Sequence, residues 1–585
     1  CVLERGNEYL SGMFPSNASD LPKHIHISGS RKPRNQNQQD ALFDLHTSPS
    51  LNTLVANGLG GGSLINAGVM VEARPSVFDH RWPKELQHHH PENLFSGYYE
   101  STKQLLEAKD SHGDNTIERH QHHQKDPLKK HLALKRLATQ NTSNSTPLRF
   151  SSAPLTIALT EKSNNAGVKL QACNLCGDCA TGCNQEAKNS LDTNLLVKAF
   201  QQGVEIYTGA TVRNIQPITG TANNTAGGWC INVVHTKKYL RKREGSPTKI
   251  IAKKVILAAG ALGSTEILMR SQSENFAFSD QLGKRFSTNG DMLSAIFNQK
   301  KPVNAVSNED TSLNNRHVGP TITGMIDLRD NKIPVLIEEI AVPSSLHKIF
   351  RDITTTLNSV SNLTTADTEI HTKGQPKKDP LAVDNNAMKH TAAYVFMGDD
   401  GALGSLQLKK DNGNNGIQVN WPSLSSHSLF DNQINTLQGL LTTSNVGGTL
   451  LTNPMWQLTS TPQKNKGPLL TVHPLGGCAM ADDASLGVVN HLGQVFNSQN
   501  RTTTHEGLIV LDGATIPSAL GANPALTIAA VSLRAIQLLI KAWGLTPPSP
   551  QKTQNCHLTQ RPVYSHTANE TSSKNKPSTP TRIEI

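Results

Sequence analysis

A histidine and an asparagine near the C-terminus have the chemistry expected of a proton-transfer site. His473 begins the run His-Pro-Leu-Gly-Gly-Cys at 473–478, directly after a strand-like apolar run, and Asn523 precedes a proline at the start of a helical pattern. An imidazole held by proline and flexible glycines can accept or orient a proton, and an amide at a helix start can point into the same cavity. A lone histidine is more often structural, so only the combination favours a reactive site.

Four clustered cysteines could hold a metal or redox centre. Cys173, Cys176, Cys179 and Cys183 have the C-x2-C-x2-C-x3-C spacing of bacterial ferredoxins, with Asn184 where ferredoxins have proline. No second cysteine run exists, so Cys183 or the distant Cys230 would have to complete one site. Three interpretations remain open: a [4Fe–4S] cluster, a zinc site, or a cysteine-rich turn with reduced thiols or a disulfide.

Glycine is concentrated in residues 57–68, where Gly58, Gly60, Gly61 and Gly62 fall within five positions. Because glycine has no Cβ, its backbone N–H groups can approach a phosphate closely. The alternative is a mobile loop, but the apolar continuation at 63–66 favours a packed segment. The loop therefore indicates a phosphate-bearing cofactor.

Glu4 ends a short apolar run at the beginning of the sequence. In a βαβ dinucleotide-binding unit, an acid at such a strand tip accepts hydrogen bonds from ribose hydroxyls. The glycine-rich turn and helix that would precede it are absent, so we expect a fragment that lacks about its first βα unit. The alternative is an ordinary strand that ends in a solvated glutamate.

The elements that would position these residues alternate between strands and helices. Residues 255–260 form a continuous apolar run, followed by a glycine turn and a helix start at 263–268. Alternating apolar runs separated by turn signals predict an antiparallel sheet near residues 295–425; the runs lie at 321–327, 333–341 and 392–397. The predicted fold class is α/β.

In their order and spacing, these motifs resemble those of the glucose–methanol–choline (GMC) oxidoreductases, in particular the branch of the bacterial cholesterol oxidases. The resemblance covers about residues 1–75 and 165–545. It implies a discontinuous FAD/NAD(P)-binding, Rossmann-like domain around a mostly parallel sheet, and a substrate-binding domain with an antiparallel sheet. The expected divisions are a FAD-binding domain at 1–75, 165–294 and 465–545, a partly flexible, His-rich insertion at 76–164, a substrate-binding domain at 295–464 and a disordered tail at 546–585.

The resemblance also implies a tightly bound FAD. Glu4 would bind the adenosine ribose, the backbone at Val212 would contact the adenine, and Ala525 would lie by the flavin edge. His473 and Asn523 match the pair that faces the substrate hydroxyl in this family. The full set of implied cofactor contacts is Glu4, Gly58, Gly60, Gly61, Gly62, Asn66, Ala67, Val69, Val212, Asp512, Gly513 and Ala525.

The implied activity is oxidation of an alcohol, a sterol or another bulky apolar alcohol, to the carbonyl by hydride transfer to flavin N5. The electrons would then pass to O₂ or another acceptor, and steroid or lipid metabolism is the expected setting. Cholesterol oxidases also carry a glutamate that shifts the steroid double bond; alignment of residues 339–343 places His347 at that position. We therefore expect oxidation to persist while isomerisation weakens. The alternatives are a quinone- or carrier-linked dehydrogenase that uses the cysteine cluster, and a non-catalytic flavin or iron–sulfur electron carrier.

Composition excludes several other classes. The 585 residues carry a net charge of +10, but only 17% are charged and the basic residues are scattered, which argues against nucleic-acid binding. The longest apolar stretch is interrupted by Arg534 and Lys541, so we expect no membrane span. A polar stretch at 87–145 is read as a solvated insertion rather than a metal site; its histidines are His88, His89, His90, His120, His122 and His123. Nothing in the sequence indicates the compartment.

Overall fold

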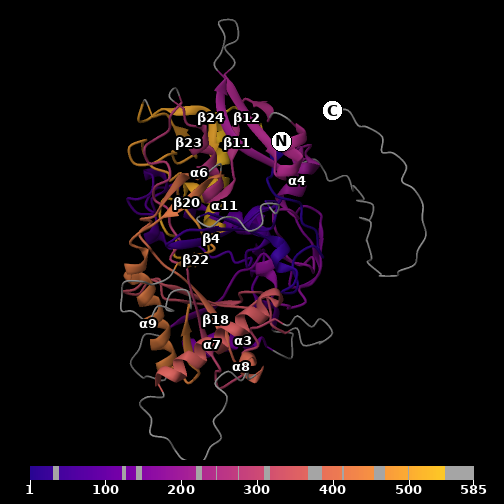
Figure 1. Cartoon of the computed structure of the whole chain (residues 1–585), viewed down its shortest axis with the longest axis vertical. Coiled ribbons are helices and arrows are strands. Elements are labelled where there is room, and N and C mark those ends of the chain that lie inside the picture. The colour runs from indigo at the N-terminus through magenta and orange to yellow at the C-terminus, as the bar shows by residue number, and fades with distance from the viewer. Residues whose placement is uncertain are drawn as a thin grey trace, which may run out of the picture. The chain divides into compact units, whose positions relative to one another are not determined.

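The structure is a computed structural model of the chain. It describes residues 1–29, 39–121, 127–139, 148–218, 227–244, 247–273, 276–307, 317–365, 385–411, 414–453, 468–498 and 500–546. Residues Cys1–Leu539 form one compact unit (Figure 1), and a second unit, Ile540–Ile585, is described only as far as residue 546. His122, His123 and the predicted tail after residue 546 lie outside the described residues.

Short parallel strand pairs form the part of the chain expected to bind the cofactor. β1 (Val2–Leu3) pairs in parallel with β10 (Ile206–Tyr207), and β14 (Val255–Leu257) pairs in parallel with β24 (Thr504–Val510). Helix α6 (Gly260–Ser271) follows β14 directly, which confirms the predicted strand, turn and helix.

Two further sheets accompany these pairs. β2 (Ile25–Gly29), β3 (Phe43–Thr47), β4 (Leu51–Ala56) and β22 (Leu469–Thr471) form a mixed sheet in that order, and β11 (Ala210–Ile218), β12 (Gly228–His235) and β13 (Thr248–Ala252) form an antiparallel meander. The cofactor-binding part therefore contains several small sheets instead of one continuous, mostly parallel sheet.

The predicted antiparallel sheet is confirmed and is larger than expected. Its order is β21-β15-β18-β17-β16-β7, and every neighbouring pair is antiparallel. The strands are β7 (Arg149–Ser152), β15 (Met292–Phe297), β16 (Gly324–Asp327), β17 (Leu336–Ile340), β18 (Ala392–Met397) and β21 (Thr449–Thr452). Edge strand β7 comes from the segment interpreted as an insertion.

Both faces of this sheet are buried. On one face, Ile337 and Phe396 pack with helices α3 (Lys129–Ala138) and α9 (Ser428–Thr443), which lie beside β18 in Figure 1 together with α7 (His347–Thr365). On the other face, Leu336 and Val395 pack with apolar residues of the glycine-rich and cysteine-rich segments. Because side chains alternate along a strand, neighbouring residues of β17 contact different parts of the molecule.

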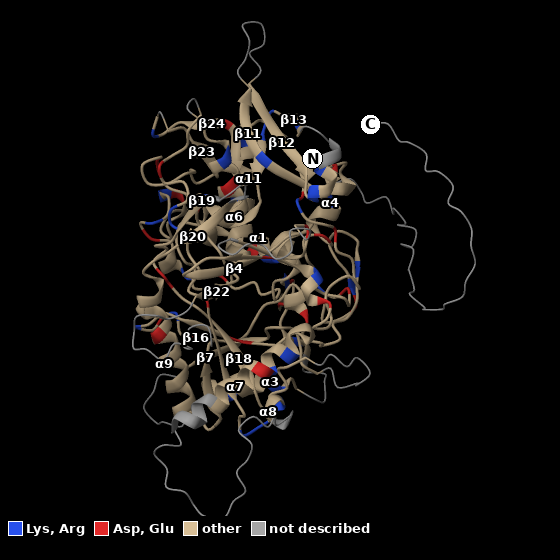
Figure 2. Cartoon of the chain, in the orientation of Figure 1, with Lys and Arg blue, Asp and Glu red and all other residues tan. Residues whose placement is uncertain are grey.

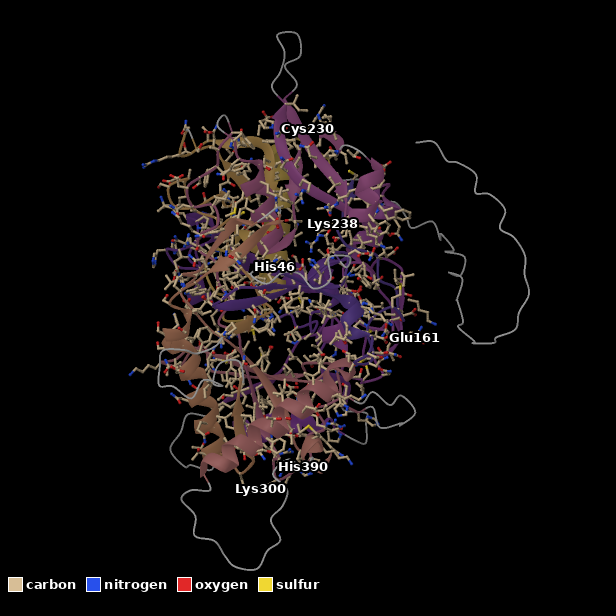
Figure 3. The ribbon with its side chains drawn as sticks, in the orientation of Figure 1. His46, Glu161, Cys230, Lys238, Lys300 and His390 are labelled. Carbon is tan, nitrogen blue, oxygen red and sulfur yellow. The ribbon has the colours of Figure 1, made fainter. Side chains whose placement is uncertain are left out.

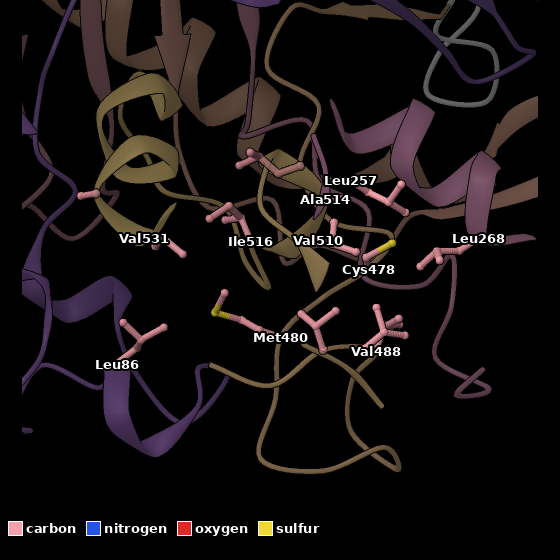
Figure 4. Close-up of a cluster of buried hydrophobic side chains, with 14 of the residues drawn as sticks. Leu86, Leu257, Leu268, Cys478, Met480, Val488, Val510, Ala514, Ile516 and Val531 are labelled. Atoms are coloured by element: carbon pink, nitrogen blue, oxygen red, sulfur yellow. The ribbon is translucent and has the colours of Figure 1, made fainter. Parts of the chain in front are cut away.

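Helix α11 (Pro524–Ala542) is the described helix that is long and apolar enough to cross a membrane. Its Leu526, Ala530 and Val531 are buried in the main hydrophobic core, and Figure 4 shows Val531 in this cluster. Arg534 is also fully buried; its Nε donates to the Glu92 carbonyl at 2.8 Å. Packing within the protein core therefore accounts for part of the apolar composition of α11, of which 39% is buried.

The charged residues are dispersed along the ribbon (Figure 2). The remaining helices are short. The helices are α1 (Tyr98–Leu105), α2 (Ile117–Gln121), α4 (Leu195–Gln201), α5 (Lys238–Glu244) and α8 (Asn385–Lys389). The other strands are β5 (Lys109–Asp110), β6 (Gly113–Asp114), β8 (Lys162–Ser163), β9 (Lys169–Leu170), β19 (Ser405–Asp411), β20 (Asn414–Asn420) and β23 (Gln494–Phe496).

Candidate functional site

Glu4 follows β1 and lies against the strand that carries Val212. Its carbonyl accepts a hydrogen bond of 2.8 Å from the Ala210 N–H at the start of β11, and its Oε1 accepts one of 2.6 Å from the Gly6 N–H. Burial raises the pKa of Glu4 above its ordinary value. The structure thus brings together the two residues expected at the adenosine end of the cofactor.

The glycine-rich loop leaves open space beside its backbone. Gly60 has a φ of +111°, a conformation that favours glycine, and it begins the 3-10 turn Gly61–Leu64. A Cβ placed on Gly61 or Gly62 would meet no heavy atom within 4 Å. The backbone here can therefore be approached by a ligand, as the sequence predicted.

A buried lysine that the sequence analysis missed fixes the end of this loop. The Lys188 ammonium donates to the carbonyls of Leu64 at 3.1 Å, Asn66 at 2.5 Å and Cys179 at 3.2 Å. Burial lowers its pKa to about 8. Lys188 thus joins the loop that contains Asn66 and Ala67 to the cysteine-rich segment.

His473 is held by a carboxylate from the start of β15. Its Nδ1 lies 2.7 Å from Oδ1 of Asp291, and its backbone N–H donates to Oδ2 of the same side chain at 3.1 Å. Burial favours the neutral imidazole, but the Asp291 carboxylate outweighs burial and holds the pKa of His473 above its ordinary value. Nε2 is therefore the ring nitrogen of His473 that does not contact Asp291.

Asn523 contacts a second carboxyl group, that of Glu338 on β17. The Asn523 Nδ2 donates to Glu338 Oε2 at 2.9 Å, and both side chains are buried. Burial raises the pKa of Glu338 to about 7, against the lowering effect of the Asn523 amide. Oδ1 of Asn523 and Oε1 of Glu338 are buried and have no hydrogen-bond partner among the described residues. A catalytic role, or a water or ion bound at the site, is the kind of explanation that such an unpaired buried acceptor requires.

One short segment supports the loops of both proposed catalytic residues. Asn289 binds the chain before Asn523: its Oδ1 accepts from the N–H groups of Leu520 at 2.8 Å and Gly521 at 3.1 Å. Two residues later, Asp291 binds the loop of His473. The segment 289–291 therefore positions His473 and Asn523 together.

The other predicted cofactor residues lie around the same loops. Asp512 accepts hydrogen bonds from the Gly260 N–H at 2.9 Å and the Ala514 N–H at 2.8 Å, so part of its capacity is used within the protein. The Gly513 carbonyl accepts from the Gly476 N–H at 2.9 Å, which ties it to the histidine motif. Cys478 ends that motif inside the hydrophobic core (Figure 4). Ala525 packs against that core, whereas Ala67 and Val69 belong to a cluster that includes Ala522.

The four clustered cysteines line one small cavity together with Lys188 and Asp178. The cavity has a volume of about 10 Å³, which is room for one water molecule. Burial raises the pKa of Cys173, of Cys179 and, to about 12, of Cys176. Within the described residues, no three Cys, His, Asp or Glu side chains form a group that could hold a metal ion.

This arrangement does not fit a metal ion or an iron–sulfur cluster as it stands. Cys230, considered as a fourth ligand, lies on β12 (Figure 3) and is not among the residues that line the cavity. The loop is tightly built: Asp178 accepts from the Ser344 N–H at 2.7 Å, and a Cβ on Gly182 would lie 2.0 Å from the Phe14 ring. The geometry favours a packed cysteine-rich turn.

The structure places His347 apart from the contact between Asn523 and Glu338, and its alignment with the isomerase glutamate stays a prediction. His347 begins α7, whereas the carboxyl group that contacts Asn523 belongs to Glu338, nine residues earlier. The sequence contained the adjacent pair Glu338 and Glu339, but only the register of β17 decides which one faces the site. The sequence analysis also did not single out Asp291 and Lys188 as site residues. The only local signal was that Asp291 follows a glycine and that Lys188 follows the cysteine motif.

Solved structures share the fold. Pyridoxine 4-oxidase from Mesorbium loti superposes with a TM-score of 0.50 at 13% identity, covering 92% of this chain and 98% of that one. A fungal aryl-alcohol oxidase superposes with a TM-score of 0.51 at 14% identity, covering 93% and 94%. The chain therefore has the fold of these two oxidases, which is of the predicted α/β class.

Sequence comparisons place the chain within that class. Two family models, both described as GMC oxidoreductase, match residues 45–288 and 468–532. The chain belongs to the GMC oxidoreductase family. A cholesterol oxidase of Acinetobacter baumannii is 25% identical over 425 residues, covering 67% of this chain and 65% of that protein. One of Mycobacterium tuberculosis is 25% identical over 414 residues, covering 64% and 60%. The chain thus spans less than two thirds of the length of these relatives.

Proposed function

We propose that this chain is the catalytic part of a FAD-dependent enzyme that oxidises an alcohol to the carbonyl. The observation that carries the proposal is the Asn523–Glu338 contact, in which one acceptor atom of each side chain is buried and has no partner among the described residues; the charge of Glu338 also acts on His473. Membership of the GMC family, whose members bind FAD, supports the same reading.

The residues present fit the cofactor. Open space at Gly61 and Gly62 leaves the loop backbone accessible, and Glu4, which follows β1, would bind the ribose. Bound FAD would supply the hydride acceptor. The further proposed contacts of FAD are Gly58, Gly60, Gly61, Gly62, Asn66, Ala67, Val69, Val212, Asp512, Gly513 and Ala525.

The protein residues would manage the proton and the orientation of the substrate. The neutral His473 takes the hydroxyl proton at Nε2, because Nδ1 is occupied by Asp291. The Asn523 amide, held by Glu338, orients the alcohol oxygen or the cofactor edge. Burial of these groups excludes water and strengthens their electrostatic effect on the reacting atoms.

A bulky apolar alcohol of the sterol type is the proposed substrate class, supported by the two cholesterol oxidases among the relatives. Glu338 supplies a buried carboxyl group of raised pKa beside Asn523, so an isomerisation step need not depend on His347. Steroid metabolism is the corresponding proposed setting. The alternatives, a carrier-linked dehydrogenase and a non-catalytic electron carrier, have no support from the geometry of the cysteine cavity.

The test is to purify the full-length protein, record its visible spectrum and mix it anaerobically with alcohols. Sterols, aryl alcohols and small alcohols form the panel. Flavin absorbance that bleaches with sterols supports the proposal and its substrate class, and bleaching with another alcohol supports only the reaction. A folded, full-length protein that takes up no FAD would contradict the function itself.

A further inference from the structure

Asp291 is a buried carboxylate that serves His473 with both of its oxygens. Its exposed fraction is 3%. Oδ1 accepts from the ring Nδ1 at 2.7 Å, while Oδ2 accepts from Thr471 Oγ1 at 2.8 Å, from the Val472 N–H at 2.9 Å and from the His473 N–H at 3.1 Å. Within the described residues, Asp291 forms its ion pair with His473.

These contacts determine which nitrogen of His473 is reactive. A carboxylate can only accept a hydrogen bond, so the ring proton of neutral His473 must lie on Nδ1. Nε2 then carries the lone pair. The three additional donors on Oδ2 fix the carboxylate relative to the histidine backbone, so Oδ1 stays in place to hold the ring Nδ1.

We propose that Asp291 is a positioning residue for alcohol oxidation, which keeps Nε2 of His473 unprotonated and stabilises the imidazolium formed during the reaction. The inference rests on the proposed function. In that step the O–H bond of the alcohol breaks and an Nε2–H bond forms on His473. Bound FAD would take the carbinol hydrogen with its electron pair, as a hydride, and the C–O bond would become a carbonyl. Asp291 stays ionised and compensates the positive charge on His473.

The charges that face His473 are those of Asp291, from the start of β15, and Glu338, from β17. Both favour the imidazolium, and among the described residues Asp291 is the one with a hydrogen bond to the ring. Removal of its charge should therefore lower the pKa of His473 by about 1 unit or more, the usual effect of losing a contacting opposite charge. Loss of the fixed tautomer should slow the reaction even where the histidine is neutral.

The first measurement uses the wild-type holoprotein and needs no activity. Histidines are labelled with ¹⁵N and ¹³C, and the signal absent from His473→Gln assigns His473. The proposal expects a protonated Nδ1 in the neutral ring and a titration midpoint above the ordinary histidine value. A neutral ring protonated on Nε2 would overturn it.

The second measurement compares anaerobic flavin reduction across pH in wild type, Asp291→Asn and Thr471→Val. The asparagine variant should shift the acidic limb down by about 1 pH unit or more. It should also lower the limiting rate by at least about tenfold, toward the about 10⁴-fold loss that follows when an aspartate no longer holds the tautomer of a catalytic histidine. Thr471→Val removes the hydroxyl that contacts both Asp291 and the His473 N–H but keeps the carboxylate charge, so its acidic limb should shift less than that of Asp291→Asn.

The outcomes are distinct. If wild-type flavin is reduced by no alcohol, the proposed function fails, while the tautomer measured in the resting protein still decides the role of Asp291. If wild type reacts and Asp291→Asn shows an unshifted pH profile, the positioning role is wrong. If Asp291→Asn does not fold, the wild-type titration remains the decisive result.

Discussion

Glu338 and Glu339 are neighbours on β17 and face opposite sides of the sheet. Glu338 Oε2 accepts from the Asn523 amide at 2.9 Å, whereas Glu339 Oε1 accepts from the Lys130 ammonium of α3, also at 2.9 Å. The Glu338 carboxyl group therefore lies beside the proposed site with a raised pKa, whereas the charge of Glu339 is compensated by the buried Lys130 ammonium. The two should respond differently to pH and to mutation.

Glu338 should make the protein less stable as pH rises from about 4.5 to about 7. Its pKa in the folded chain is raised from 4.5 to about 7, so the folded state binds the proton more tightly than the unfolded state does. The stabilisation that Glu338 gives is complete below its pKa in the unfolded chain and is lost as pH rises through its pKa in the folded chain. The loss amounts to about 3 kcal/mol at about 1.4 kcal/mol per pKa unit.

The experiment measures the free energy of unfolding in urea at several pH values for wild type and Glu338→Gln. The difference, wild type minus variant, should fall across this range. Glu161→Gln is the control, because that side chain is 56% exposed and pairs at the surface with Lys169 (Figure 3). A difference independent of pH for Glu338→Gln would contradict the prediction.

Lys130→Met should strongly destabilise the protein. Lys130 and Glu339 have exposed side-chain fractions of 0% and 2%, so the substitution leaves an uncompensated buried carboxylate. Breaking a buried pair in this way costs about 3–5 kcal/mol. The double variant Lys130→Met, Glu339→Leu should recover much of that loss, because no charge remains buried. Lys169→Met at the surface should cost at most about 1 kcal/mol in the same denaturation assay.

His473→Gln should lower the rate of flavin reduction by about 10²–10⁴-fold, since glutamine keeps a donor but cannot take a proton. Asn523→Leu should also slow reduction, with FAD still bound. Substrate affinity should change little, because a bulky alcohol gains most of its binding energy by apolar burial. Anaerobic stopped-flow spectroscopy gives the rates, with His347→Gln as the control of unchanged rate. Wild-type reduction in His473→Gln would reject the assignment.

Cys176→Ser should leave the flavin content unchanged. The thiol lines a cavity of about 10 Å³ in a packed turn, so serine replaces it with little change in volume. The check is the flavin-to-protein ratio, together with iron analysis and absorbance near 400 nm, roughly where iron–sulfur clusters absorb. Iron in the wild type that disappears with the substitution would show that the cysteines bind a cluster and that the packed turn is the wrong interpretation.

The sequence predicted the features that depend on residues close together in the chain. The strand and helix at β14 and α6 and three strands of the antiparallel sheet follow from periodicity or a short motif. The pair His473 and Asn523 also follows from short motifs, and its catalytic role stays a prediction. Register could not be predicted: a shift of one residue along β17 would exchange Glu338 and Glu339 between the two faces. Contacts between distant residues were equally hidden, since Asp291 and His473 meet only after the chain folds.

The segment 289–291 has a consequence for how this site can vary. Because Asn289 holds the approach to Asn523 and Asp291 holds His473, a displacement of the segment carries both loops with it. The two side chains therefore share one support, and their separation should change little when that segment moves. Substitutions that reshape the walls of the substrate space can then accumulate without disturbing the reacting geometry, which is the condition under which one scaffold acquires new substrates.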